Sequence, residues 1–234
     1  MKSKKDGVVR TKDLEGKKVL VTAGPTREPI DAVRFLSNPS TGRMGFALAS
    51  AAERRGAEVI LISGPTVLVP PEGINFIRVG TALEMYQAVL RELQGVDIFI
   101  AAAAVADYHP KKFFPGKIKK QGRKNLLLQL QPNPDILKEV GRKKGEKILI
   151  GFSAETEGLV KNACLKLREK NLDFIVANDL TQEGSGFALE TNRVKIIDRE
   201  GRIENLPLMS KAKVAEHILD RVGEVMKSRK ALGA

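Results

Sequence analysis

The sequence has very few of the residues that build disulfides, metal sites and covalent active sites. Its 234 residues include one cysteine, two histidines and no tryptophan. A single cysteine, Cys164, excludes an internal disulfide and a cysteine-built metal site, and is typical of a protein of the reducing cytoplasm. His109 and His217 have no further ligand at a suitable spacing, which argues against zinc. Because no Gly-x-Ser-x-Gly motif is present, we expect chemistry based on positioning and charge stabilisation.

Long apolar runs are also missing. No segment is long and apolar enough to span a bilayer. Residues 1–16 are basic and polar, without the apolar region of a signal peptide. We therefore expect a cytoplasmic protein with a tail or linker at 1–16 and one domain at 17–234.

Positive charge is in excess, since 40 Lys and Arg residues against 28 Asp and Glu residues give a formal charge of +12. Such a charge favours an anionic partner, which could be nucleic acid, a membrane surface or a phosphorylated small molecule. A solvated surface rich in ion pairs explains it equally well. No aromatic residues accompany the basic start of the chain and no reader helix is evident. We expect neither nucleic acid nor membrane as a partner, and a basic nucleic-acid-binding protein is the weakest alternative.

Hydrophobic periodicity predicts an α/β fold with a Rossmann-like, doubly wound and mostly parallel sheet. The predicted strands are 17–22, 58–62, 74–79, 96–101, 125–131, 148–152 and 174–177. The first predicted helix begins near Met44 and ends at Gly56, which is its C-cap. The others span 82–93, 134–142, 158–170 and 210–226, the last with Ser210 as N-cap. A hairpin is predicted from 193–198 and 202–206.

Two long connections, residues 23–42 and 102–124, leave the carboxyl ends of predicted strands. Structureless connections of this length in a compact domain are usually functional. In an open parallel sheet, ligands bind beyond the carboxyl ends of the strands, where the strand order reverses. The two connections are therefore the predicted binding site.

The first connection ends in hydroxyls and glycines directly before a helix. Ser40, Thr41 and Gly42 would offer hydroxyls and backbone N–H groups at the positive end of the helix dipole, which suits an anion. The same residues could simply turn the chain and cap the helix. No Walker A spacing follows, and G-x-G-x-x-G is absent. The second strand is followed by Ser63 and Gly64 instead of an acidic residue, so an NADP-dependent reductase is the weaker interpretation.

The second connection starts within a run of four alanines, 101–104, and continues to an acidic residue and a lysine-rich segment. Small side chains at Ala101, Ala102 and Ala103 would let a base or phosphate approach the backbone, although alanine runs often serve packing alone. Asp107 could bind sugar hydroxyls or a metal, and the lysine-rich segment 117–120 could neutralise developing charge in phosphoryl or nucleotidyl transfer. Without a ligand, the lysines would be an ordinary solvated loop.

Taken together, six segments resemble phosphopantothenate cysteine ligase, also called phosphopantothenoylcysteine synthetase. They are 22–31 (TAGPTREPID), 37–45 (SNPSTGRMG), 103–108 (AAVADY), 117–120 (KIKK), 133–136 (NPDI) and 151–156 (GFSAET). The resemblance implies that 4'-phosphopantothenate and cysteine are joined by an amide bond in coenzyme A biosynthesis. It also implies CTP as the activating nucleotide, Mg²⁺, an acyl-cytidylate intermediate, and release of pyrophosphate and CMP.

The resemblance also implies roles for individual residues. Asn38 would bind the activated acyl group and support its conversion to product, while Lys117 would assist formation of the intermediate. Nucleotide contacts are implied for Ala101, Ala102, Ala103, Asp107, Lys117, Pro134, Asp135, Ile136, Leu137, Phe152, Lys166 and Lys170. Substrate contacts are expected at Gly24, Asn38, Ser40, Thr41, Gly42 and Met44. No residue is assigned to Mg²⁺.

Members of this family are often fused to a flavin-dependent decarboxylase, for which these segments offer no counterpart. The resemblance therefore implies either a stand-alone ligase or one half of a longer protein. It also implies a homodimer, and we expect the hairpin at 193–206 to form the contact. Lys166 and Lys170 are four residues apart, which places them on one face of the predicted helix.

Overall fold

The computed structural model describes residues 12–120, 125–155, 157–179, 186 and 189–232. Its centre is an eight-stranded sheet in the order β13-β12-β10-β9-β6-β1-β4-β5. Neighbouring strands from β5 to β10 are parallel. These strands are β1 (Lys18–Ala23), β4 (Glu58–Ser63), β5 (Asn75–Arg78), β6 (Ile98–Ala101), β9 (Ile148–Glu155) and β10 (Phe174–Asp179). The order reverses between β1 and β6, so the predicted Rossmann-like, doubly wound sheet is confirmed.

The carboxyl-terminal part follows the predicted order of hairpin and helix. β12 (Val194–Asp198) pairs antiparallel with β10, and β13 (Ile203–Asn205) pairs antiparallel with β12. A short pair, β11 (Thr191–Asn192) with β14 (Met209–Ser210), leads into α5 (Lys211–Leu232). The Lys213 amide donates to Ser210 Oγ at 3.3 Å, which confirms the predicted N-cap, although the helix extends beyond the predicted end at 226.

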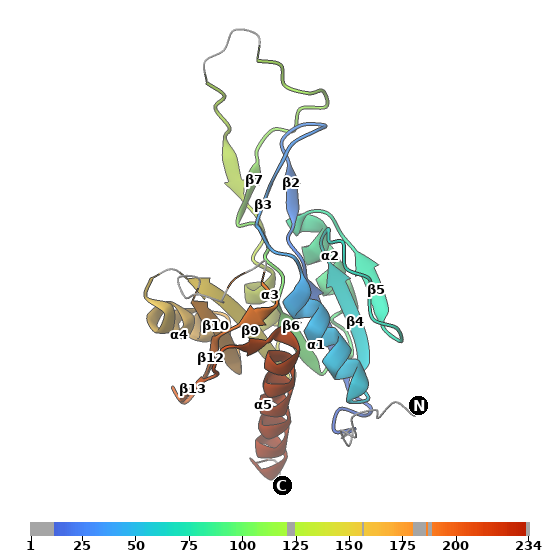
Figure 1. Ribbon diagram of the computed structural model, residues 1–234, viewed down its shortest axis with the longest axis vertical. Coiled ribbons are helices and arrows are strands. Elements are labelled where there is room, and N and C mark those ends of the chain that lie inside the picture. Colours follow the sequence, from blue (N-terminus) through green and yellow to red (C-terminus); the bar gives the residue numbers. More distant parts are fainter. Residues whose placement is uncertain (1–11, 121–124, 156, 180–185, 187–188, 233–234) are drawn as a thin grey trace, which may run out of the picture.

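Helices cover both faces of the sheet (Figure 1). α1 (Arg43–Arg54) and α5 pack together over one face, against Val19 and Val21 of β1. α2 (Ala82–Glu92), α3 (Ile136–Arg142) and α4 (Leu159–Glu169) cover the other face, toward which Leu20 points. The alternation of apolar side chains in β1 therefore serves two cores at once, as expected for a strand buried on both sides.

A glycine holds α1 against the end of β1. A Cβ atom added at Gly45 would lie 2.5 Å from the Ala23 Cβ and 2.9 Å from the Thr22 carbonyl oxygen. Only glycine permits this separation, because real Cβ atoms do not approach other heavy atoms so closely. The close approach brings the first turn of α1, and the loop before it, directly to the carboxyl end of β1.

The two long connections are not structureless, which corrects the sequence-based expectation. They form an arm that projects from the carboxyl edge of the sheet (Figure 1). In the first connection β2 (Arg27–Pro29) pairs with β3 (Phe35–Ser37). In the second, β7 (Tyr108–Pro110) pairs with β8 (Leu130–Pro132). The two ribbons contact each other through β2 and β7. We call residues 27–37, together with the described residues of 108–132, the arm.

The strand predicted at 125–131 was wrong in extent and in place. Only Leu130–Pro132 is a strand, and it belongs to the arm instead of the central sheet. The leucine run suggested a buried strand, but Leu127 is 94% exposed. A run of apolar residues can belong to the core of a domain or to an exposed surface patch, and the tertiary structure decides between them.

Asp31 joins the two halves of the arm. Its carboxylate accepts hydrogen bonds from the Val33 amide at 2.9 Å, the Arg34 amide at 2.8 Å and the Ile118 amide at 3.0 Å. The Arg34 guanidinium pairs with the same carboxylate and donates to the Ile118 carbonyl at 2.9 Å. The guanidinium, opposed by burial and aided by the backbone amides, holds the pKa of Asp31 far below its usual range. Asp31 thus remains charged and keeps the segment around residue 118 in place.

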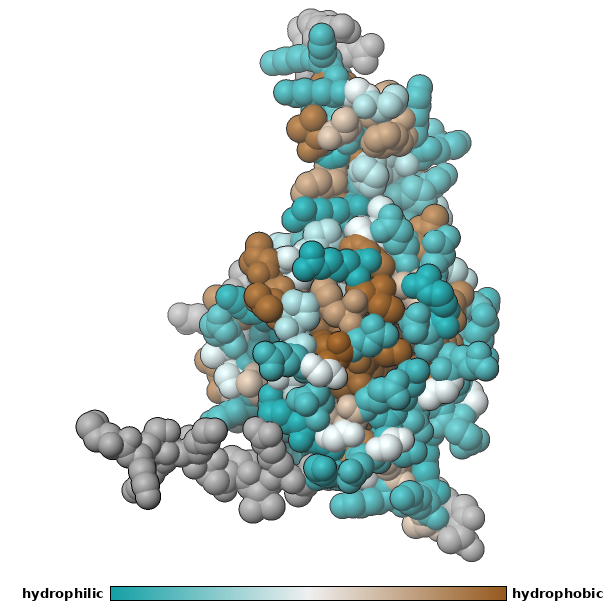
Figure 2. Space-filling view, turned by 90° about the vertical axis from the view of Figure 1, so that its right-hand side faces the viewer, coloured by the Kyte–Doolittle hydropathy of each residue, from teal (hydrophilic) through white to brown (hydrophobic). Residues whose placement is uncertain are grey.

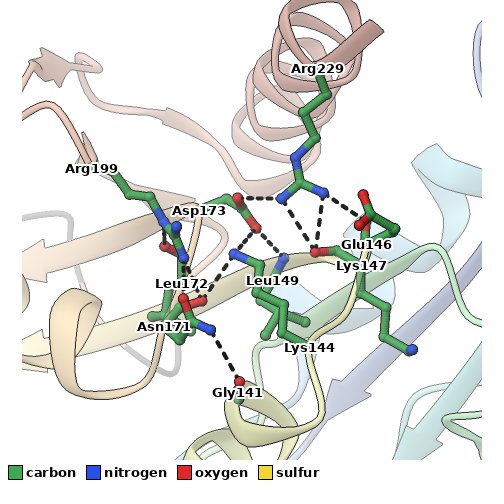
Figure 3. Close-up of polar contacts among 10 residues, drawn as sticks. All are labelled: Gly141, Lys144, Glu146, Lys147, Leu149, Asn171, Leu172, Asp173, Arg199 and Arg229. Atoms are coloured by element: carbon green, nitrogen blue, oxygen red, sulfur yellow. Dashed lines mark hydrogen bonds and ion pairs between the residues drawn. The ribbon is translucent and has the colours of Figure 1, made fainter. Parts of the chain in front are cut away.

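Opposite the arm, a polar cluster ties the far end of α5 to the sheet (Figure 3). The buried carboxylate of Asp173 lies 2.7 Å from Lys144 Nζ and 2.6 Å from an Arg229 guanidinium nitrogen. It also accepts a hydrogen bond from the Leu149 amide at 2.8 Å. Arg199 donates to the Asn171 carbonyl at 2.8 Å beside it. Ion pairs and hydrogen bonds to charged groups therefore tie this end of α5 to the sheet.

The packed part of the chain begins before residue 17. Leu14 is completely buried in the core with α1 and α5, and Asp13 accepts a 2.9 Å hydrogen bond from Arg55. Residues 1–11 lie outside the described part of the chain. The predicted helix at 134–142 starts at Ile136, two residues late, because Asp135 is its N-cap. Among the described helices none combines the length and apolarity that crossing a membrane requires.

Candidate functional site

A cavity of about 650 Å³ lies at the carboxyl edge of the sheet, where the strand order reverses. Thr22 of β1 and Ala101 of β6 form its floor. The loop before α1, the start of the arm, the first turn of α3 and one face of α4 surround it. This is the position at which doubly wound sheets bind ligands. The cavity brings together residues from both long connections, as the sequence predicted.

One end of the cavity is formed by the loop before α1. Asn38, Ser40, Gly42 and Met44 line it. The Asn38 side-chain amide donates to the Ala104 carbonyl at 3.1 Å and so links the two connections. Gly42, at φ 81°, precedes the first helical residue, which leaves the backbone N–H groups of the first turn near the cavity.

Gly24 and Thr41 are not among the lining residues. Gly24 lies behind the loop, where a Cβ atom at Gly42 would come within 3.3 Å of its backbone. The Thr41 carbonyl accepts a hydrogen bond from the Thr66 hydroxyl at 3.0 Å. Both residues pack on the side of the loop that faces away from the cavity. Their contact with a substrate stays a prediction.

The other end contains the residues for which nucleotide contacts were expected. All of them except Lys117 line the cavity, namely Ala101, Ala102, Ala103, Asp107, Pro134, Asp135, Ile136, Leu137, Phe152, Lys166 and Lys170. They come from β6, the start of the arm, α3, β9 and α4. Residues that lie far apart in the sequence are thus gathered around one space.

Lys166 of α4 and Lys170 at its C-cap both line the cavity, in agreement with the prediction that they share one helix face. Lys166 Nζ lies 2.7 Å from Glu155, and Lys170 Nζ lies 3.0 Å from Asp135. Burial opposes the ionisation of Glu155, but hydrogen bonds from Lys166 and Ser153 outweigh it and lower the pKa of this carboxyl. Both ammonium groups are therefore held at the cavity wall by carboxylates, in a position to exchange them for the phosphates of a ligand.

Lys117 is the one predicted catalytic residue that lies elsewhere. It is exposed on the arm, beside the Ile118 backbone that Asp31 and Arg34 hold. It does not line the cavity of its own chain. The sequence analysis assigned Lys117 and Asn38 to one site, but within one chain only Asn38 lines the cavity.

Several cavity residues escaped the sequence analysis. Arg43, Asn178, Asn192 and Lys211 line the cavity and come from α1, β10, β11 and α5. Asn178 could have been found, because it is a polar residue at the end of a buried strand on the same edge of the sheet. Lys211 could not, because the first residue of an amphipathic helix is ordinarily solvated.

The described residues contain no group of three or more acidic, histidine or cysteine side chains that could hold a metal ion. Asp107 is an exposed carboxylate in the cavity wall. One carboxylate together with substrate phosphates is a common way to bind Mg²⁺. Asp107 is therefore a cavity carboxylate that could contact a metal ion bound to the phosphates of a ligand.

Comparison with known proteins identifies the family. Residues 14–226 match the model of the DNA/pantothenate metabolism flavoprotein C-terminal domain. The chain belongs to this family. It is 51% identical over 215 residues to the coenzyme A biosynthesis bifunctional protein CoaBC of Bacillus subtilis, covering 92% of this chain and 53% of that protein. The chain thus spans about half the length of this relative.

Solved structures agree with the fold. The chain is similar to a crystal structure of the C-terminal domain of a coenzyme A biosynthesis bifunctional protein CoaBC, with TM-score 0.80 and 42% identity, covering 93% of this chain and 100% of that one. A Cab2 mutant in complex with phosphopantothenate-cysteine has TM-score 0.73 at 18% identity, covering 92% of this chain and 89% of that one. At this lower identity the likeness supports the fold alone.

Proposed function

We propose that this protein is a ligase that joins 4'-phosphopantothenate to cysteine at the expense of CTP, in coenzyme A biosynthesis. The observation that carries the proposal is the single cavity that gathers Asn38 and the loop before α1 with the nucleotide-type residues of β6, α3 and α4. Membership of a family whose relatives are coenzyme A biosynthesis proteins supports it.

The chemistry has two steps with balanced leaving groups. In the first, a carboxylate oxygen of phosphopantothenate attacks the α-phosphorus of CTP, and the bond to pyrophosphate breaks. In the second, the cysteine nitrogen attacks the acyl carbon, and CMP leaves while the nitrogen loses a proton. Lys166 and Lys170 would hold the phosphates, and the Asn38 amide would orient the acyl group. Mg²⁺ bound to the triphosphate would neutralise its charge, and Asp107, a carboxylate of the cavity wall, could contact it.

The base of the nucleotide would lie between the start of α3 and Phe152. Backbone groups there can read the edge of a base, and the Phe152 ring can contact its face. Turnover with CTP and ATP side by side, measuring pyrophosphate, nucleoside monophosphate and amide product, tests the proposal. Failure to form pyrophosphate or amide with either nucleotide would reject the ligase function.

We further propose that the protein is a homodimer in which the arm of one chain contacts the other chain. Large apolar side chains are exposed on the arm, including Val33, Phe35, Phe113, Leu127 and Leu130. Figure 2 shows apolar groups among the charged ones on the projecting part of the molecule. Exposed apolar surface of this kind is typical of interfaces. A second chain would also explain how Lys117 reaches a cavity.

Leu127→Lys is expected to shift the protein from dimer to monomer, because it places a charge on the most exposed leucine of the arm. Analytical ultracentrifugation measures the change. Ile203→Lys is the matched control, since Ile203 lies on edge strand β13 of the hairpin and is 42% exposed. If Ile203→Lys dissociates the protein and Leu127→Lys does not, the hairpin is the interface, as the sequence analysis expected.

Lys117→Gln is expected to slow the formation of acyl nucleotide by about 10-fold to 100-fold, since one positive charge at the triphosphate is lost. Release of pyrophosphate in the absence of cysteine measures this step. The Lys117→Gln and Asn38→Ala variants can be mixed, dissociated and reassociated to form a heterodimer. One of its two cavities then has an intact Asn38 from one chain and an intact Lys117 from the other, so part of the activity should return. No recovery in the mixture would place Lys117 in the cavity of its own chain.

A further inference from the structure

The part of the cavity wall that β10, β11 and the start of α5 form contains polar groups without a role in the proposed reaction. Asn178 ends β10, and Lys211 begins α5. Both line the cavity, together with Asn192 of β11. These residues lie on the face of the sheet that α1 and α5 cover, away from the lysines of α4.

Asn178 has an unsatisfied polar atom. Its side-chain oxygen Oδ1 is buried and has no hydrogen-bond partner among the described residues, and the residue is only 8% exposed. Phe174 and Val176 belong to the core cluster of the α1 and α5 face, so the alternation of β10 directs Asn178 to the same face. Buried polar atoms are nearly always paired. An unpaired acceptor at a cavity wall therefore indicates a ligand that donates a hydrogen bond.

Lys211 adds a buried positive charge to the wall of the same cavity. The residue is 7% exposed, and its ammonium donates to the Gly186 carbonyl at 3.1 Å. Burial and the charge of Arg43 lower the pKa of Lys211, whereas Glu190 raises it. Arg43 pairs with Glu190 at 2.9 Å and also lines the cavity. A buried ammonium at the beginning of a helix, with a second cation close by, suits an anionic group of a ligand.

We propose that Asn178 and Lys211 form the subsite for the amino acid that accepts the acyl group. Lys211 Nζ binds its α-carboxylate, and Asn178 Oδ1 accepts a hydrogen bond from its α-amino group. The inference rests on the proposed ligase function. A neutral amine has two hydrogens and a lone pair, so it can donate to Asn178 while the lone pair attacks the acyl carbon. The nitrogen–carbon bond forms, the bond from that carbon to the nucleotide oxygen breaks, and a proton passes to solvent.

The phosphate of phosphopantothenate is the other anion that this end could bind. A phosphate dianion offers acceptors alone, and these would face the unpaired oxygen of Asn178 without any donor. An α-amino acid carries both an anion and an N–H donor, which are the two kinds of group that Lys211 and Asn178 can bind. The carboxylate of cysteine therefore fits this end better than the phosphate.

The test compares acceptors with and without a carboxylate. Lys211→Met is expected to lower kcat/KM for cysteine by about 30-fold and that for cysteamine, which lacks the carboxylate, by less than about 3-fold. Asn178→Ala should lower kcat/KM for both acceptors by about 10-fold, because both present the amine. Lys213→Met, an exposed lysine two residues further along α5, is the matched control and should change neither value. Thermal unfolding of each variant confirms that it is folded.

Two outcomes would overturn the inference. An equal loss for cysteine and cysteamine in Lys211→Met would leave this lysine a structural role. A fall in the preference for phosphopantothenate over pantothenate, with the preference for cysteine unchanged, would assign the subsite to the phosphate. Formation of acyl nucleotide by the wild-type protein needs no amino acid. If it occurs, the ligase function stands even when the acceptor subsite fails, and if it does not occur, the ligase function itself fails.

Discussion

Asn38→Ala is expected to lower the rate of amide formation by about 100-fold while acyl nucleotide and pyrophosphate still form. The Asn38 amide lies where the two long connections meet, bonded to the Ala104 carbonyl at 3.1 Å, and faces the cavity. A donor held in this way stabilises negative charge on the acyl oxygen as the amine attacks. Activation places its charge on the phosphates instead, so the first step depends less on Asn38.

Rapid-quench measurement of pyrophosphate and amide from one turnover separates the two steps. The expected pattern for Asn38→Ala is a normal burst of pyrophosphate, accumulation of acyl nucleotide and slow amide formation. Ser37→Ala is a suitable control, because Ser37 is adjacent and exposed and its hydroxyl bonds to backbone carbonyls, that of Thr26 at 2.7 Å and that of Asn38 at 3.4 Å. Its rates should stay within about 3-fold of the wild type. Equal loss of both steps in Asn38→Ala would mean that Asn38 shapes the cavity without acting in the second step.

The sequence predicted the sheet and the place of the cavity because both depend on local patterns. Strands such as β1 and β4 are short, apolar and β-branched, and the helices between them have clear starts and ends. The rule that ligands bind where strand order reverses then located the site. Eleven of the twelve residues with expected nucleotide contacts line one cavity, and Lys117 is the exception.

The arm could not be predicted from the same patterns. Its strands are three residues long, and its two ribbons are joined by contacts between distant segments, such as the bond from the Ile118 amide to Asp31, 87 residues away. Its apolar residues are exposed, so the usual link between apolar character and the core failed for Leu127. Tertiary context also hid Lys211, which is buried although most lysines at helix starts are not.

Asp173→Ala is expected to have the largest effect on stability, a loss of about 3–5 kcal/mol, because it leaves buried positive charge without its partner. Lys144 and Asp173 side chains are each only 8% exposed and lie 2.7 Å apart, and Arg229 approaches the same carboxylate from α5 (Figure 3). The variant also removes the acceptor for the Leu149 amide. Asp173→Asn keeps an acceptor and loses only the charge, so its loss should be smaller. Urea unfolding measures both values.

The loss should also depend on pH in a defined direction. Burial lowers the pKa of Lys144, and the hydrogen bond and charge of Asp173 oppose that shift. Without Asp173 the pKa of Lys144 falls further, so the folded variant can release the proton at a pH where the unfolded chain still binds it. Stability then rises with pH between the folded and unfolded pKa values. The difference between Asp173→Ala and the wild type should therefore be largest near neutral pH and shrink as pH approaches the usual lysine pKa.

Glu58→Ala, which removes an exposed pair with Lys18 at 3.4 Å, should change stability by less than about 1 kcal/mol at any of these pH values. A constant deficit for Asp173→Ala across this range would show that the lost backbone acceptor, and not the unpaired lysine, accounts for the destabilisation.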